Sequence, residues 1–227
     1  MHAPKQTFAA ENALYPFLTF AAVGGFLEVY TYMLHGGVFC NAQTGNLVLL
    51  FLNLTEASWA DASHYLYSLL AYVAGILVSA ALPLWLRQRH AAIAVTCLEA
   101  AALAGLAFIP AGAPNWYTYV SVSFLCALQY NTFTSCRDAK LATTFCTNNL
   151  RQLTLNLFGA AREKSRQKLR LAGTYAAVIL FFAAGAVAGG FAAEVMGNYC
   201  ILLCTAALLP AAAWLLFSSR PEQGAEQ

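Results

Sequence analysis

Two glutamates stand inside long apolar stretches and are the clearest candidates for chemistry in this sequence. Glu28 lies among small and polar residues such as Tyr30 and Thr31, whereas Glu99 lies in a run of alanines. An ionisable side chain at membrane depth is costly and usually functional, so each carboxyl is a candidate carrier of a proton or a coupling cation. The alternative is a protonated or paired glutamate that only supports the structure. The neighbours of Glu28 favour the coupling role, and both roles stay open for Glu99.

A short polar motif occurs twice and forms the second candidate site. Residues 44–54 (TGNLVLLFLNL) and 147–157 (TNNLRQLTLNL) lie 103 positions apart and agree at seven of eleven positions. Such a match indicates an internal duplication. The residues that open the two copies are candidates for binding a solute: Thr44, Gly45, Asn46, Thr147, Asn148 and Asn149.

The same six positions also allow a structural interpretation. Thr and Asn commonly cap helices and bridge neighbouring helices by hydrogen bonds, and we expect Thr44 and Thr147 to be N-caps. Asn53 and Asn156 lie at the far end of each copy, where the structural role is favoured.

One basic residue lies within the second copy of the motif. Arg151 stands where the first copy has Val48. Three roles are open to it: pairing with Glu28 or Glu99, binding an anionic solute, or extending its charged end to the membrane surface.

The composition is typical of an integral membrane protein. Of the 227 residues, 60% are hydrophobic and 10% are charged, against roughly a quarter charged in soluble domains. We find no P-loop, no H-E-x-x-H, no nucleophile with an obvious His partner, and no basic patch interleaved with aromatic residues. We therefore expect no enzymatic activity, no cofactor or metal, and no nucleic-acid binding. The expected partners are membrane lipid and an unknown small solute, and a homo-oligomer is left open.

Six stretches are apolar over about twenty residues and are predicted to span the membrane. They cover approximately residues 14–34, 64–86, 91–109, 116–135, 171–191 and 199–217. Basic residues follow the second, fourth and sixth stretches, whereas the loops after the first, third and fifth have none. Because basic loops stay in the cytoplasm, both termini are predicted to be cytoplasmic in a multi-pass protein of the bacterial inner membrane.

Two further stretches, 37–54 and 141–158, are apolar only in their second halves. By the same charge rule, 141–158 begins and ends in the cytoplasm, and 37–54 begins and ends outside. We predict that both are re-entrant segments, each with an irregular entry and a half-helix of about eleven residues.

The chain is thus predicted to be an all-α polytopic membrane protein with six transmembrane helices in a 3+3 inverted repeat. Residues 72–77 and 175–180 match at the same spacing and extend the duplication. Three spans per half force opposite orientations, an architecture found in transporters. The predicted regions are a cytoplasmic segment, two membrane repeats and a cytoplasmic tail: 1–13, 14–109, 116–217 and 218–227.

The motifs resemble a known family over nearly the whole chain, from about 14 to 217. The sequences GFLEVY, GVF and TGN around Glu28 and Thr44 resemble the first signature of the YoaK family, and CALQ with ATTFCTNNLR resembles the second. This resemblance implies a small bacterial inner-membrane protein of unestablished activity. Two positions depart from the family pattern: Glu28 stands where Asp is common, and Asn148 where Gly is common.

We therefore expect a small-solute transporter or channel whose site lies between the two polar motifs, with Glu28 as the titrating group. The alternative is a non-transporting membrane scaffold or partner subunit, in which the polar motifs lock helices together.

Overall fold

A computed structural model of the chain describes residues 13–110, 112–136, 139–141, 143 and 146–218. The terminal segments predicted to be cytoplasmic, 1–13 and 218–227, lie outside the described residues except for one residue each.

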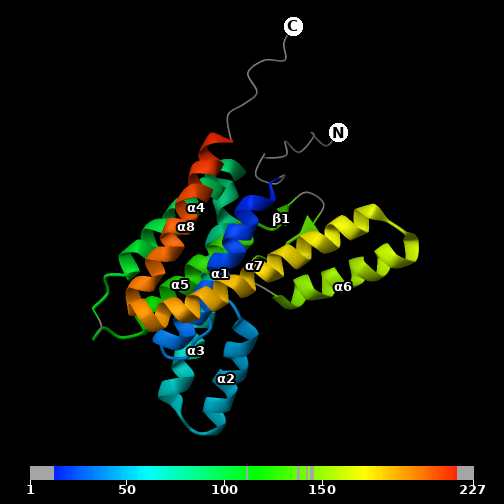
Figure 1. The fold of residues 1–227 in the computed structure, drawn as a ribbon. Helices are drawn as coiled ribbons and strands as arrows, with labels where there is room; N and C mark the ends of the chain where they lie inside the picture. Colours follow the sequence, from blue (N-terminus) through cyan, green and yellow to red (C-terminus); the bar gives the residue numbers. More distant parts are fainter. Residues whose placement is uncertain (1–12, 111, 137–138, 142, 144–145, 219–227) are drawn as a thin grey trace.

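The described part of the chain is almost entirely helical (Figure 1). Its elements in chain order are α1 (Leu14–Leu34), α2 (Gln43–Thr55), α3 (Trp59–Ala81), η2 (Leu82–Leu84), α4 (Gln88–Leu106), α5 (Trp116–Thr132), β1 (Ser135–Cys136), β2 (Ala139–Lys140), α6 (Cys146–Glu163), α7 (Arg166–Met196), η3 (Gly197–Ile201) and α8 (Leu202–Phe217). β1 and β2 form a two-residue antiparallel pair that sequence reasoning did not anticipate. The predicted all-α class is confirmed.

The helices pack in pairs that repeat between the two halves of the chain. α1 packs along α7, and its counterpart α5 packs along α3. The short helix α2 packs on α3, as α6 packs on α7, and α4 packs on α8. In Figure 1, α2 with α3 and α6 with α7 each form a hairpin that projects from the central bundle. If α1, α2, α3 and α4 are exchanged with α5, α6, α7 and α8, respectively, the same pairs of helices are in major contact.

Glycines bring the backbones of the main helix pairs into direct contact. A Cβ on Gly25 of α1 would overlap the carbonyl oxygen of Phe182, and one on Gly185 of α7 would overlap that of Ala22. At the other crossing, a Cβ on Gly75 of α3 would overlap the carbonyl oxygen of Phe124. Small residues permit this close approach where helices pack within a membrane. Each of these pairs joins a helix of one half to a helix of the other.

Within the described part of the chain, four stretches are long and apolar enough to cross a membrane by length and composition: Leu14–Leu34, Trp59–Leu84, Gln88–Leu106 and Arg166–Phe217. The last of them contains both α7 and α8, and α5 has 17 residues. Many large apolar side chains point outward, among them Val195 at 85% exposure. An outer surface this apolar is typical of a protein embedded in lipid.

The helix bounds differ from the predicted ones where charged residues lie. α2 has 13 residues, close to the predicted half-helix, but α6 has 18, so the prediction of about eleven is wrong there. α7 starts at Arg166 and has 31 residues, whereas the sequence predicted a span from 171. Hydropathy finds the apolar part of a helix, and Arg, Lys and Gln continue the helix beyond it because they are good helix formers.

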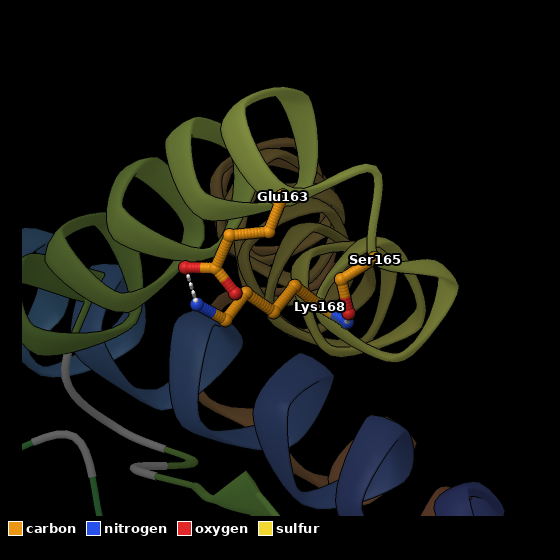
Figure 2. Close-up of polar contacts among 3 residues, drawn as sticks. All are labelled: Glu163, Ser165 and Lys168. Carbon is orange, nitrogen blue, oxygen red and sulfur yellow. Dashed lines mark hydrogen bonds and ion pairs between the residues drawn. The ribbon is translucent and has the colours of Figure 1, made fainter.

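The turn between α6 and α7 shows what stops these longer helices (Figure 2). Lys164 has a φ of +50°, which no helix can continue through. Ser165 then caps α7 by accepting the backbone N–H of Lys168 at 3.4 Å. The ammonium of Lys168 reaches back to Glu163 at 2.6 Å, and its stem crosses Gly159 of α6. The charged residues Glu163, Lys164 and Lys168 therefore belong to a helical hairpin rather than to an open loop.

Candidate functional site

Glu28 is buried in α1 and holds the irregular segment that precedes α2. Its Oε2 accepts the backbone N–H of Asn41 at 2.8 Å, and Oε1 accepts that of Ala42 at 2.9 Å. The thiol of Cys40 also points at Oε2, at 3.2 Å. Free N–H groups and the positive end of the helix dipole favour an anion at the start of a helix. At α2 the carboxyl group of Glu28 accepts the N–H groups that directly precede the helix.

The expected N-caps are therefore corrected by the structure. α2 begins at Gln43 after Ala42, which makes no side-chain cap, and Thr44 is the second helical residue. Thr147 is likewise the second residue of α6, which begins at Cys146. Glu28 instead accepts the N–H groups of Asn41 and Ala42, which directly precede α2.

Asn46 also holds the irregular segment that precedes α2. It is 1% exposed; its Oδ1 accepts the N–H of Phe39 at 3.0 Å, and its Nδ2 lies 2.6 Å from the carbonyl oxygen of Phe39. The same nitrogen lies 3.2 Å from the hydroxyl of Ser68 on α3, which continues to Ser123 on α5 at 2.8 Å. Gly45 lies beneath the ring of Phe39. Asn46 thus bridges the loop and two helices.

The two copies of the motif show the same pattern of burial. Asn46 and Asn149 are buried, whereas Thr44, Thr147 and Asn148 are exposed. Further along each helix, Asn53 donates to the carbonyl of Leu49 and Asn156 to that of Gln152, both at 2.8 Å. These local bonds fit the structural role predicted for Asn53 and Asn156.

Both short helices start close to Glu28. α2 follows directly from the N–H groups that Glu28 accepts, and Glu28 acts electrostatically on Cys146, the first residue of α6. In Figure 1, α2 and α6 begin near the centre of the molecule and extend from it in different directions. The structure therefore places Glu28 and the openings of both motifs in one region.

Glu99 forms a second buried polar contact. It is 1% exposed in α4, and the side-chain amide of Gln129 on α5 donates to both of its carboxylate oxygens, at 3.0 and 2.8 Å. Gln129 is thus an interhelical hydrogen-bonding residue. Cys126, one turn before it on α5, lies within electrostatic range of both Glu99 and Glu28. Cys126 also lies 3.9 Å from Cys40, whose thiol contacts Glu28.

No basic side chain neutralises either carboxyl among the described residues. Arg151 is exposed on α6 and forms no salt bridge with Glu28 or Glu99 within that part of the chain. A buried carboxylate without a counter-charge is strongly destabilising unless hydrogen bonds or a bound proton compensate it. Glu28 has backbone donors for this purpose and Glu99 has one amide.

Sequence reasoning missed Asn41 as part of this site. Its side chain is buried; Nδ2 lies 3.4 Å from the carbonyl of Gly24, and Oδ1 has no hydrogen-bond partner among the described residues. Asn41 stands in an irregular segment, where no helical or strand periodicity could single it out.

The described residues contain no cluster of three or more His, Cys, Asp or Glu that could hold a metal ion. The closest approach recorded between two cysteines joins Cys40 to Cys126 at 3.9 Å.

Fold and site together define a helical, membrane-type protein with buried carboxyls. The chain belongs to a family of proteins of unknown function (DUF1275), whose model matches residues 17–214. No curated protein matches the chain, and no solved structure does. The narrower resemblance to the YoaK proteins stays a prediction.

Proposed function

We propose that this protein is a transporter or channel that moves a small solute across the bacterial inner membrane, with Glu28 as the group that couples movement to a proton or cation. The observation that carries the proposal is the buried, unneutralised Glu28 at the start of α2. Ionisable residues at membrane depth mostly mark substrate, ion or proton pathways.

The proposed architecture is the six-span 3+3 inverted repeat, with α2 and α6 as the re-entrant elements and both termini in the cytoplasm. Its support is the exchange of helix contacts between halves: α1 on α7 matches α5 on α3, and α2 on α3 matches α6 on α7. Transporters with inverted repeats place their sites where broken or short helices from both halves meet. The motif openings at Thr44–Asn46 and Thr147–Asn149 are the corresponding residues here.

The bonds of Glu28 suggest how a bound proton could change the structure. A charged carboxylate accepts hydrogen bonds about twice as strong as those of a neutral group. Protonating Glu28 therefore weakens its hold on Asn41 and Ala42, and with it the position of the segment that leads into α2. Oδ1 of Asn41, which has no hydrogen-bond partner among the described residues, is a further oxygen that could accept a hydrogen bond or coordinate a cation.

Transport with the purified full chain tests this proposal. A thermal-shift screen against small metabolites identifies a solute, because a ligand that binds the native state stabilises it. Proteoliposomes that contain a pH-sensitive dye then report proton movement when that solute is added. We expect Glu28→Gln to abolish coupled movement while the protein stays folded in the membrane.

Glu194→Gln is the matched control, because Glu194 is an exposed glutamate on α7. It should behave as the wild type does. Wild-type movement of solute and protons by Glu28→Gln would remove Glu28 from the mechanism.

Topology has its own test. Cysteines introduced by Trp59→Cys and Ser165→Cys, with the exposed Cys97 replaced by Ser, should label from opposite sides of sealed membranes. Labelling from the same side would rule out the inverted arrangement.

A membrane scaffold is the second candidate, and Asn46 favours it. Both ends of its amide group are bonded within the chain, to Phe39 and Ser68 among others, so it has little capacity left for a solute. If the motifs are structural only, Asn46→Ala with Asn149→Ala lowers the thermal stability of the protein, and the screen finds no solute that stabilises the wild type.

A further inference from the structure

A cavity of about 500 Å³ lies at the end of the molecule where α1 and α4 end, and Glu28 is not among its lining residues. It is enclosed by the end of α1, the connection from α4 to α5, and the turn from α7 into η3. Figure 1 shows that connection and that turn at the same end of the bundle. Most of its wall is apolar, with Leu34, Phe108, Pro110, Pro114 and Met196 among the lining residues.

Asn198 organises the polar part of the wall. Its Nδ2 donates to the carbonyls of Leu106 and Ala107 at the end of α4, at 3.0 and 3.1 Å. Its Oδ1 must therefore be the acceptor for the hydroxyl of Tyr30, at 2.5 Å, and for Nε2 of His35, at 3.2 Å. This pattern assigns the proton of a neutral His35 ring to Nε2.

The other ring nitrogen of His35 is then a hydrogen-bond acceptor, and the side chain of Asn115 near the ring does not reach it in ordinary hydrogen-bond geometry. His35 is 9% exposed and lines the cavity, and its Nδ1 has no hydrogen-bond partner among the described residues. Burial lowers the pKa of His35 below its usual value of 6.5, against opposing effects of Asn198 and Asn115, so the ring is neutral at pH 7. A buried acceptor left unpaired is destabilising, and a ligand donor would relieve it.

The lining also excludes charged ligands. None of its residues is Lys, Arg, Asp or Glu, and its remaining polar side chains include Asn115 and the buried Thr118. An ammonium or a carboxylate would enter without a counter-charge. Two aromatic rings, Phe108 and Tyr199, stand edge to face with centroids 6.1 Å apart at the rim of the cavity. Such rings favour a flat apolar body.

We propose that this cavity binds a small, uncharged phenol-like molecule that donates its hydroxyl hydrogen to Nδ1 of His35. The apolar walls hold the ring of the ligand, and Asn198 keeps the histidine in the accepting tautomer. The inference concerns binding at this cavity alone, and it is independent of Glu28 and of transport.

Fluorine NMR on the full chain in nanodiscs tests the inference with a matched pair of probes. 4-Fluorophenol carries the hydroxyl donor, and 4-fluoroanisole replaces its hydrogen with a methyl group. Empty nanodiscs correct for partition into lipid. We expect saturable binding of 4-fluorophenol, and binding of 4-fluoroanisole about tenfold weaker, which is the effect of one hydrogen bond.

Three variants complete the test. His35→Phe keeps a ring and removes the acceptor, so it should abolish the preference for 4-fluorophenol. Met196→Trp, at a half-exposed lining position, fills the cavity and should weaken both probes, which keeps the inference testable if His35→Phe does not fold. His90→Phe changes an exposed histidine at the opposite end of α4 and should leave both affinities unchanged.

Equal affinity of the wild type for the two probes, partition into lipid only, or stronger binding of 4-fluorobenzoate than of 4-fluorophenol would overturn the proposal. So would unchanged binding in both His35→Phe and Met196→Trp.

Discussion

Glu28 and Glu99 are both buried glutamates of apolar helices, but they are held by different kinds of partner. Glu28 accepts backbone N–H groups from an irregular segment, whereas Glu99 accepts the side-chain amide of Gln129 from a packed helix. An irregular segment can shift when one carboxyl changes charge, but a helix packed along its length resists such a shift. From this difference we expect a change of charge at Glu28 to move structure, and we expect Glu99 mainly to join two helices.

The largest expected effect is the loss of stability when Glu28 no longer holds this segment. Glu28→Ala removes the acceptor of the Asn41 and Ala42 N–H groups and should lower the free energy of unfolding by about 3 kcal/mol. Denaturant titration of the protein in detergent micelles measures it. Hydrogen exchange at residues 41 and 42 should accelerate, and unchanged exchange there would contradict the assigned bonds.

The second largest loss of stability is expected at Asn46, which also holds the segment before α2. Asn46→Ala leaves both backbone groups of Phe39 without their partner and should cost about 2 kcal/mol, measured by the same titration. Thr44→Ala, two residues earlier in α2, is the matched control. Because Thr44 is exposed, this change should leave the free energy of unfolding nearly unchanged. Equal losses in the free energy of unfolding in the two variants would show that the bonds of Asn46 do not hold this segment.

A double-mutant cycle tests whether Glu99 serves mainly to join helices. Glu99→Leu alone leaves the Gln129 amide unpaired, and Gln129→Leu alone leaves the carboxyl unpaired, so each should be destabilising. The double variant should be less destabilised than the sum, with a coupling of about 1 kcal/mol between the two sites. Additive losses would mean that the recorded contact contributes little.

The smallest effect is expected from the asparagines at the far ends of the motifs. Asn53 and Asn156 bond only to carbonyls one turn earlier in their own helices. Replacing either with Ala should change the free energy of unfolding by less than about 0.5 kcal/mol, since Ala is the better helix former. A loss comparable with that of Asn46→Ala would indicate an interhelical role.

The sequence predicted the helices well where composition alone decides them. The apolar runs at 14–34 and 91–109 correspond closely to α1 and α4, and the duplicated motif correctly predicted a short helix at α2, whereas α6 is longer than predicted. Predicted ends were wrong where charged residues extend a helix, as at Arg166, because hydropathy responds to lipid contact and not to backbone geometry.

Only the charged residues of the site could be predicted from the sequence. A glutamate in an apolar run is visible at once, so Glu28 and Glu99 could be found. Asn41, His35 and Asn198 could not be assigned their contacts, because they lie at helix ends or in irregular segments and meet partners far along the chain. The bond from Tyr30 to Asn198 joins residues 168 positions apart, a pairing that no local pattern encodes.

The glycine crossings have a consequence for how this molecule could change shape. The duplication divides the chain into two consecutive halves, but the backbone contacts at Gly25, Gly185 and Gly75 join α1 to α7 and α3 to α5. Helices in backbone contact cannot slide without collision, so each such pair behaves as one rigid body. We therefore expect any rearrangement of these helices to move interlocked units, each built from both halves.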